Sequence, residues 1–455
     1  MTELRPENVS ARGRVSWVLF EWARNPYVLV ITVYVYATYF SRDVVGDPVK
    51  GQALWAAIQG YAGLGVAILA PFLGAIADAG GRRKPWVFAF ALMFAAATAA
   101  LWFGQPGGAG LGLFGIGAAV AFANIAYDGS LVFHSAMLPS LVPPARIGRW
   151  SGLGYALGNV AGIVLLIFIL VFIYLPQQPL LGLNRALHEH ERISGPLCAV
   201  WFALFSVPFF LWTPDRASTR LPVGEAVRRG FESVARTAKS LPRYRNVTAY
   251  LLARMIYNDG LNVMLSFGGV YAAGVFGWGA IESALYGIVL SVFAALGGFL
   301  GGRLGDAIGT KRALQLSISG TILAAILSLG FAPDRWFFFF SYPAGEKLAP
   351  LPLFATAPEL FYIASVMLIA VCLVATYANS RAMMARIAPP ERMTEFFGLY
   401  ALSGEATAFA APAAVAFATV ASGSQQWGMA VILGFLAVGL AGLTFVREER
   451  GGTSV

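Results

Sequence analysis

The sequence predicts an all-α polytopic membrane protein, with twelve transmembrane helices in two pseudo-symmetric six-helix bundles. Two observations predict this fold: a series of long apolar segments, and a motif that occurs twice. The 455 residues are 58% hydrophobic and 12% charged, and the mean hydropathy is +0.68. A soluble domain carries about 25% charged residues, so the composition indicates a membrane protein.

The apolar segments are continuous runs of about 20 residues, long enough to span a bilayer as helices. A transmembrane β-barrel would show alternating polarity instead, so the pattern excludes that fold. We expect the twelve helices at 17–40, 52–77, 86–104, 111–138, 151–175, 195–212, 246–272, 280–303, 312–332, 359–386, 396–420 and 425–446.

The second observation is an internal duplication. A glycine, then Asp78 four positions later, then Gly81 and a basic cluster recur around Asp306, 228 residues downstream. Related segments that begin at Pro143 and Pro389 are 246 residues apart. Duplicated halves are typical of secondary transporters. We predict an N-terminal bundle at 1–212, a cytoplasmic linker at 213–245 and a C-terminal bundle at 246–455.

Positive charge is unequally divided between the two predicted sides of the membrane. The side with both termini holds 23 of the 32 Lys and Arg residues, the other side holds 6, and 3 lie inside helices. By the positive-inside rule, both termini and the linker are cytoplasmic. The net charge of +9 is therefore interpreted as a topology signal, with no nucleic-acid partner. Within the linker, 224–240 is expected to form an amphipathic helix along the inner membrane surface.

Two local patterns have structural interpretations. Gly154, Gly158 and Gly162 recur at every fourth residue, which allows close helix packing, and a flexing helix is the alternative. Trp336 and the four Phe residues after it are interpreted as an interfacial aromatic belt.

The sequence contains no pattern of an enzyme or of a metal site. Cys198 and Cys372 both lie in apolar helices, so we predict no disulfide and no bound metal. His188 and His190, two residues apart in a predicted outer loop, are interpreted as solvated. No phosphate-binding loop or nucleophile elbow occurs, so we predict a protein that is not an enzyme and has no cofactor.

The doubled motif resembles the loop signature of the major facilitator superfamily. Four further segments resemble the vacuole-effluxer family of autophagy-related amino-acid exporters and their bacterial relatives, at 16–27, 75–85, 136–139 and 395–404. The resemblance implies the major facilitator fold, with helices 1, 4, 7 and 10 around a central cavity. It also implies that the protein lies in the bacterial inner (plasma) membrane and exports small solutes across it. The chain departs from these relatives at Glu21, Arg24 and Glu405, which affects the expected substrate more than the fold.

Eight ionisable residues lie inside predicted helices, where charge is costly and usually functional. Seven are on the four helices that the resemblance assigns to the cavity: Glu21, Arg24, Asp128, His134, Arg254, Asp259 and Arg381, with Glu405 on helix 11 as the eighth. Glu21 and Arg24 are three residues apart and are expected to pair. Arg381 has no acidic neighbour in its helix, so we expect it to receive an outside anion.

These residues divide into two predicted roles. Arginine matches a carboxylate with its planar fork, which predicts substrate binding by Arg24, Asn25, Tyr127, Arg254, Asn258 and Arg381. Buried carboxylates can titrate near neutral pH, which predicts proton coupling through Glu21, Asp128, Asp259 and Glu405.

A third role is predicted at the inner ends of helices 2 and 8, where Asp78 and Asp306 lie beside basic turns. A carboxylate there can accept hydrogen bonds from a neighbouring helix N-terminus or from an arginine. We therefore predict a gating set of Asp78, Arg82, Arg83, Asp306, Lys311 and Arg312.

Together these features predict a monomeric secondary active transporter in the lipid bilayer. Its substrate is expected to be a small anionic or zwitterionic solute, an amino acid or small peptide, exported by alternating access with a proton as coupling ion. Two alternatives stay open: an exporter of lipids or amphipathic compounds, and a non-transporting membrane assembly factor on the same fold.

Overall fold

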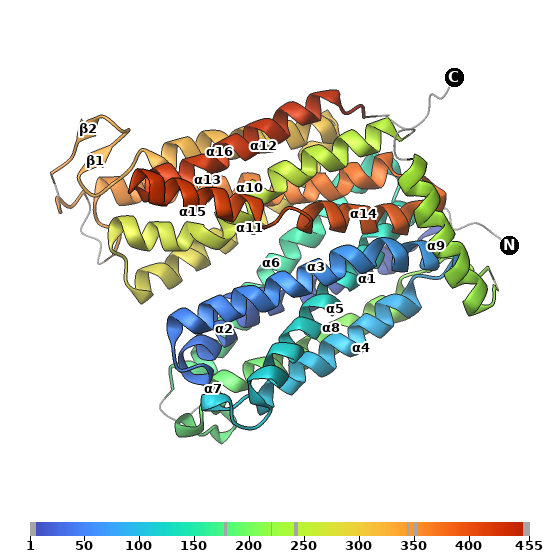
Figure 1. Ribbon diagram of the computed structural model, residues 1–455, viewed down its shortest axis with the longest axis horizontal. Coiled ribbons are helices and arrows are strands. Elements are labelled where there is room, and N and C mark those ends of the chain that lie inside the picture. The colour runs from blue at the N-terminus through green and yellow to red at the C-terminus, as the bar shows by residue number, and fades with distance from the viewer. Residues whose placement is uncertain are drawn as a thin grey trace. The chain divides into compact units, whose positions relative to one another are not determined.

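The computed structural model describes residues 6–176, 180–219, 221–240, 244–343, 345–348 and 353–448. Most of these residues are helical (Figure 1). The α-helices are α1 (Ala11–Arg24), α2 (Tyr36–Tyr39), α3 (Pro48–Gly80), α4 (Lys84–Ala100), α5 (Gly112–Leu141), α6 (Ile147–Ile169), α7 (Glu189–Arg192), α8 (Ser194–Trp212), α9 (Val223–Ser240), α10 (Arg245–Phe276), α11 (Ala280–Ile308), α12 (Thr310–Leu329), α13 (Ala357–Ile387), α14 (Met393–Glu405), α15 (Ala410–Ser422) and α16 (Gln425–Gly442).

In the described ranges, ten helical segments are long and apolar enough to cross a membrane. The predicted runs at 17–40 and 246–272 are helical but fall outside these ten. The first of them is interrupted by two π-helical stretches, η2 (Val28–Tyr34) and η3 (Phe40–Val44). The polytopic helical membrane fold is therefore confirmed, and the total of twelve spans stays a prediction.

The described residues divide into two compact units. The first takes Met1–Pro144, Leu157–Lys239 and Ala388–Leu402, and the second takes Ala145–Ala156, Ser240–Ile387 and Ser403–Val455. Each unit thus includes a short segment from the other predicted half. These segments are the start of α6 in the second unit and the start of α14 in the first. The predicted domain boundaries at 212 and 246 remain predictions.

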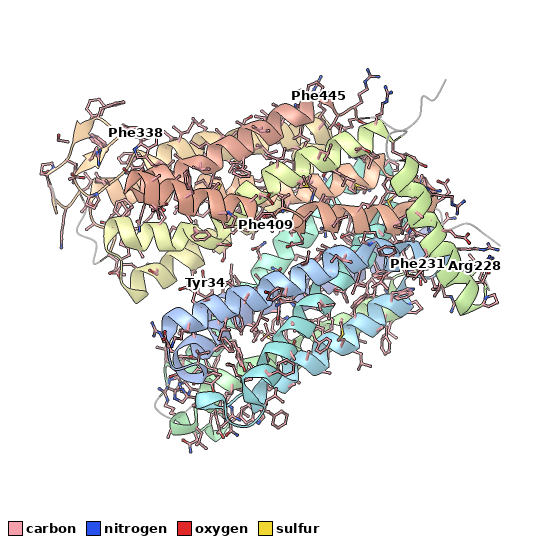
Figure 2. The ribbon with its side chains drawn as sticks, viewed as in Figure 1. Tyr34, Arg228, Phe231, Phe338, Phe409 and Phe445 are labelled. Atoms are coloured by element: carbon pink, nitrogen blue, oxygen red, sulfur yellow. The ribbon has the colours of Figure 1, made fainter. Side chains whose placement is uncertain are left out.

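In the first unit, α1 packs on α8, α4 packs on α5 and α8, and α3 packs on α5 (Figure 1). The predicted linker helix exists as α9 and lies against α3. Phe231 of α9 stacks near Phe72 of α3, with ring centroids 5.1 Å apart, while Arg228 is on the solvent side (Figure 2). The packing interpretation of the α6 glycines is supported, because Gly158 and Gly162 contact Asn25 and Leu29.

In the second unit, α11 and α12 pack on α13, and α10 and α15 pack on α16. A small hairpin that the sequence analysis did not predict follows α12. Its strands β1 (Arg335–Trp336) and β2 (Phe340–Ser341) are antiparallel. The predicted aromatic belt forms this hairpin, since aromatic residues favour strands and Phe337 and Phe338 adopt the positive φ that the tight turn requires.

The helix predicted at 396–420 lies inside a candidate membrane span, Pro390–Ser422, but it is interrupted. The chain leaves the helix after Glu405, forms turns over 406–409, and begins α15 at Ala410. Pro412 lies in the first turn of α15, where its missing N–H removes the bond that would continue the helix through the break.

Candidate functional site

In the first unit, α1 presents a buried ion pair. Arg24 Nε and Nη2 both contact Glu21 Oε2 at 2.9 Å, and each side chain is 3% exposed. A separation of three residues places both groups on one helix face. The predicted pair is confirmed.

The aromatic ring of Tyr127 on α5 covers this pair. The Arg24 guanidinium is 4.2 Å from the ring centroid, and the Tyr127 hydroxyl donates to Asn25 Oδ1 at 3.1 Å. Glu21 Oε1 also lies 3.6 Å from His134 Nδ1. Three predicted substrate ligands, Arg24, Asn25 and Tyr127, are therefore brought together.

Asp128 follows Tyr127 on α5 and is half-buried. Its charge interacts with Arg24. Within the described ranges, no hydrogen bond is recorded for its carboxylate. It is therefore an acid near the Arg24 cation that does not share the tight pairing of Glu21.

The second unit carries another polar group at the break between α14 and α15. On α10, Arg254 Nη1 donates to Ser403 Oγ at 2.8 Å, and Asn258 Nδ2 donates to the Gly404 carbonyl at 3.1 Å. A Cβ atom added to Gly404 would lie 2.9 Å from Arg254 Nη1, so a larger residue here would displace the guanidinium from its present position.

Asp259 lies next to this group and is unusual in its burial. It is 1% exposed, and its carboxylate interacts with the Thr407 hydroxyl in the helix break and with the Arg254 charge. In the described part of the chain, neither the carboxylate nor this hydroxyl makes a hydrogen bond of ordinary geometry. Buried polar groups are normally hydrogen-bonded. Glu405, the last residue of α14, is half-buried beside the break.

Arg381 on α13 is placed differently from the expectation. It is 1% exposed, donates from Nε and Nη2 to Ser151 Oγ and O at 3.0 and 2.7 Å, and lies 4.4 Å from the Tyr155 ring centroid. Ser151 and Tyr155 belong to the start of α6. Arg381 therefore holds α6 against α13. The sequence showed that Arg381 has no acidic neighbour in its helix, but it did not show these contacts with Ser151.

Asp78 caps the start of α14 in the first unit. Its carboxylate accepts bonds from Thr394 N at 2.7 Å and Glu395 N at 2.9 Å, and from Arg83 Nη2 at 3.1 Å. Arg83 in turn donates to Thr394 Oγ1 at 2.7 Å. Burial lowers the pKa of Arg83, and the Asp78 charge opposes that shift.

Asp306 makes the equivalent contacts in the second unit. It accepts from Gly148 N at 2.8 Å and Arg149 N at 2.7 Å, at the start of α6, and from Arg386 Nη2 at 3.0 Å. Arg386 also contacts Glu448 Oε1 at 2.8 Å.

Among the predicted gating cations, Arg83 bonds to Asp78, whereas the other three do not bond to either carboxylate in the described chain. Lys311 donates its backbone N–H to Glu448 at 3.0 Å and its Nζ to the Thr444 carbonyl at 3.1 Å. Arg82 and Arg312 are exposed, and no described hydrogen bond joins them to Asp78 or Asp306. Arg82 instead lines a surface cavity of about 580 Å³ together with Lys84, Asp215 and Arg216.

Comparison with known proteins agrees with this architecture. The family profile described as "Vacuole effluxer Atg22 like" matches residues 43–454. The chain belongs to this family.

Named relatives and solved structures extend the comparison. The uncharacterized MFS-type transporter YxiO of Bacillus subtilis (strain 168) is 24% identical over 438 residues, covering 95% of this chain and 94% of that protein. Autophagy-related protein 22 of Cryptococcus neoformans var. neoformans serotype D (strain JEC21) is 25% identical over 307 residues, which are 67% of this chain and 51% of that protein.

Among solved structures, the proton:xylose symporter XylE superposes with a TM-score of 0.67 at 13% identity, over 96% of both chains. The human organic anion transporter MFSD10 superposes with a TM-score of 0.65 at 14% identity, over 95% of this chain and 99% of that one. Identities this low show the fold alone. The protein is a major facilitator superfamily transporter and an integral membrane protein.

Two acidic residues outside the predicted set cap equivalent helix starts in the two halves. Asp215 accepts from Arg83 N and Lys84 N at the start of α4, and Glu448 accepts from Thr310 N and Lys311 N at the start of α12. Asp215 lies three residues after the end of α8, and Glu448 lies three residues after the short 3₁₀ helix Leu443–Phe445 that follows α16. That shared position was the available sequence signal, since a carboxylate stabilises the positive end of a helix dipole.

Proposed function

We propose that this transporter is a proton-coupled secondary active exporter of a small anionic or zwitterionic solute, an amino acid or a small peptide. It works by alternating access as a monomer in a bacterial inner (plasma) membrane, with both termini cytoplasmic, and it is not an enzyme. The observation that carries the proposal is the polar group at the break between α14 and α15. There a buried cation, Arg254, lies together with a buried acid, Asp259.

The cation of this group supports an anionic substrate. Arg254 is 7% exposed, and Asn258 beside it is 4% exposed. Interrupted helices are typical of transporter binding sites, because their free backbone groups and half-helix ends face the ligand. The N-terminus of α15 adds partial positive charge at the same break. A carboxylate substrate would therefore meet a guanidinium, an amide and a helix N-terminus.

The first unit supplies a second set of ligands, Arg24, Asn25 and Tyr127. Glu21 already neutralises Arg24 at a distance of 2.9 Å. We therefore rank Arg24 below Arg254 as the residue that binds the anionic group of the substrate. Arg381 is held by Ser151 and Tyr155, so we place it after Arg254 and Arg24 among the predicted substrate ligands.

The acid of the group supports coupling. Asp259 is 1% exposed and interacts with the Thr407 hydroxyl and the Arg254 charge, so binding or losing a proton changes its interaction with the cation of the same group. Asp128 is the corresponding candidate in the first unit, with Glu21 and Glu405 next. Asp78 and Asp306 act as gates, because they hold the starts of α14 and α6 without forming part of either polar group. Arg83 assists at Asp78, and Lys311 assists at the start of α12 through Glu448.

The experiment is a ligand screen followed by transport. Purified full-length protein is tested by thermal shift against amino acids, dipeptides, sugars and lipids, since a ligand of the folded state raises its stability. The best ligand is then followed in proteoliposomes with an imposed pH gradient. We expect carboxylate-bearing solutes to stabilise the protein and to move against their gradient. Stabilisation by lipids or neutral amphipathic compounds alone would contradict the proposal.

A further inference from the structure

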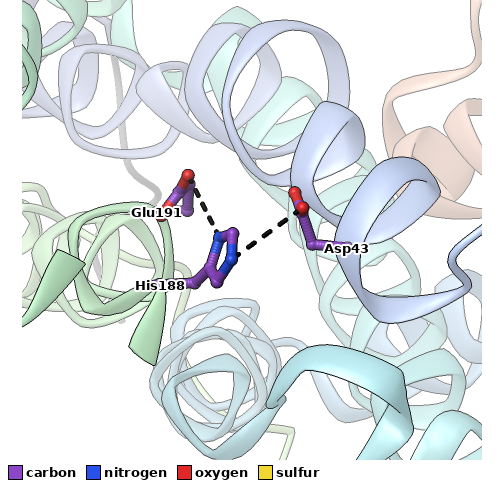
Figure 3. Close-up of side chains that lie close together, drawn as sticks. All are labelled: Asp43, His188 and Glu191. Atoms are coloured by element: carbon purple, nitrogen blue, oxygen red, sulfur yellow. Dashed lines mark ion pairs between the residues drawn. The ribbon is translucent and has the colours of Figure 1, made fainter. Parts of the chain in front are cut away.

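A cluster of ionisable side chains lies at one end of the first unit, away from the groups described above (Figure 3). Asp43 comes from η3, and His188 and Glu191 come from the short segment that precedes α8. His188 Nε2 is 3.9 Å from Asp43 Oδ1, and His188 Nδ1 is 3.5 Å from Glu191 Oε1. The chain thus brings together residues about 150 positions apart in sequence.

This cluster corrects the interpretation of the histidines as solvated. His190 and Glu191 are each 9% exposed. A four-residue helix, α7, turns these side chains inward toward the end of η3. Spacing in the sequence could not show this, because the residues converge from two segments and not from one helix face.

The hydrogen bonding of the cluster is incomplete. In the described ranges, Glu191 Oε2 and the Nδ1 atoms of His188 and His190 make no hydrogen bond. Glu191 has ion-pair contacts with both imidazoles, because His190 Nδ1 lies 2.8 Å from its Oε2 and His188 Nδ1 lies 3.5 Å from its Oε1. These contacts leave hydrogen-bonding capacity unused, which an additional ligand could satisfy.

The donor set and its spacing fit a metal ion. One ligand atom from each of Asp43, His188 and Glu191 lies within 4.8 Å of the others. A zinc ion has nitrogen and oxygen ligands at about 2.0–2.2 Å in a tetrahedron, which places neighbouring ligand atoms about 3.4 Å apart. The 3.9 Å contact with Asp43 and the 3.5 Å contact with Glu191 involve opposite nitrogens of the His188 ring. For both carboxylates to share an ion with one of these nitrogens, the ring and one carboxylate have to rotate.

The chemistry of the ligands narrows the choice of ion. Two carboxylates balance a divalent charge, and an imidazole favours zinc and similar transition metals over calcium or magnesium. We propose that Asp43, His188 and Glu191 form a binding site for a divalent transition-metal ion of the zinc type. One nitrogen of His188 binds the ion, and His190 lies against the Glu191 carboxylate as a supporting group.

Such an ion joins two parts of the first unit. Asp43 ends the helical stretch that starts at Ala11 and carries Glu21 and Arg24, while His188 and Glu191 lead directly into α8. Binding therefore fixes the far end of that stretch to the start of α8. This proposal does not depend on the proposed substrate or coupling ion.

The test uses full-length protein with its purification tag removed and treated with a chelator. Equilibrium dialysis against zinc chloride is expected to give one saturable zinc ion per chain, with a rise in thermal stability that magnesium does not produce. Asp43→Asn and Glu191→Gln should each weaken binding at least roughly tenfold, since loss of even an outer-shell group costs about 10–100-fold.

Glu189→Gln is the matched control. It removes the same charge two residues from Glu191, but Glu189 bonds to Asn184 N at 2.8 Å and is not part of the cluster. Its zinc affinity should equal that of the wild type. Equal affinity in all four proteins, or no saturable binding by the wild type, would overturn the proposal.

A measurement on the wild type alone guards against variants that fail to fold. Anomalous scattering at the zinc edge, from crystals grown with zinc, should show a peak between Asp43, His188 and Glu191. A zinc peak found only at other positions would refute the site.

Discussion

Asp259 combines two properties that are costly together in a membrane helix. It is 1% exposed, and in the described chain neither of its oxygens makes a hydrogen bond of ordinary geometry, although the Thr407 hydroxyl interacts with it. Glu21, in contrast, has Arg24 at 2.9 Å. A carboxylate that lacks such a partner changes its protonation without breaking a contact, whereas a paired one does not.

The first prediction concerns this residue. Asp259→Asn should abolish uptake driven by a pH gradient in proteoliposomes and preserve counterflow exchange, because exchange needs no net proton movement. Asp128→Asn is the matched variant in the first unit and is measured in parallel. Gradient-driven accumulation by both variants would move the coupling site to Glu21 or Glu405.

The second prediction concerns Glu448 and pH. Burial raises the pKa of Glu448, but the bonds from Lys311 N and Thr310 N and the Arg386 charge outweigh this, and the net pKa is below the ordinary value of 4.5. A group with a lowered folded-state pKa stabilises the protein above its unfolded pKa, and this stabilisation is lost as the pH falls through the folded value.

Glu448→Gln should therefore cost about 1–3 kcal/mol of stability at pH 7. The difference in Tm between variant and wild type should shrink as the pH is lowered below 4.5. Thermal melts of both proteins at pH 7 and at several pH values below 4.5 measure this. A difference that is independent of pH would show that the Glu448 charge is not what stabilises the start of α12.

At the scale of elements, the two halves use one arrangement twice. Asp78 of α3 caps the start of α14, and Asp306 of α11 caps the start of α6. These helix starts approach closely: a methyl group at Gly74 would overlap the Thr394 carbonyl, and one at Gly302 would overlap the Gly148 carbonyl. Small residues at such crossings let helix backbones meet without a hydrophobic driving force.

The third prediction tests the Asp78 cap. Asp78→Asn should impair transport and leave substrate affinity within a few-fold, because the residue biases the conformational equilibrium and does not touch the ligand. Binding in detergent and transport in proteoliposomes separate the two effects. Complete loss of binding by folded Asp78→Asn protein would contradict a gating role.

The fourth prediction tests the close approach of α3 and α14. Gly74→Val should separate the start of α14 from α3 and impair transport as Asp78→Asn does. Gly60→Val is the control on the same helix, since no atom lies within 4 Å of the position where its Cβ would be. Equal transport by the two valine variants would show that this contact is not needed for the cycle.

The sequence predicted some elements well and missed others for physical reasons. Hydropathy predicted the positions of the long apolar helices. The spacing of three residues between Glu21 and Arg24 predicted their ion pair. The sequence did not predict the break at 406–409, because a single proline, Pro412, hardly changes the mean hydropathy of an apolar segment. The sequence did not predict the cluster of Asp43, His188 and Glu191, because it forms between segments that are far apart in the chain. The contacts of Arg381 were not predicted, because its partner Ser151 is 230 residues away.

At the scale of the whole molecule, the chain is a major facilitator superfamily transporter of the Atg22-like vacuole-effluxer family. The two solved transporters compared above, XylE and MFSD10, are only 13% and 14% identical to it. Substrate class therefore has to come from this chain's own polar groups. The central claim is that Arg254, at the break between α14 and α15, receives the anionic part of the substrate.

The most direct test is equilibrium binding of the radiolabelled best ligand to wild type and Arg254→Ala in detergent. A lost charged hydrogen-bond pair costs about 1.5–3 kcal/mol, so Arg254→Ala should bind about 10–150-fold more weakly. Arg335→Ala, an exposed arginine in β1, is the control and should bind as the wild type does. Unchanged affinity in folded Arg254→Ala, or a high-affinity ligand with no anionic group, would contradict the account.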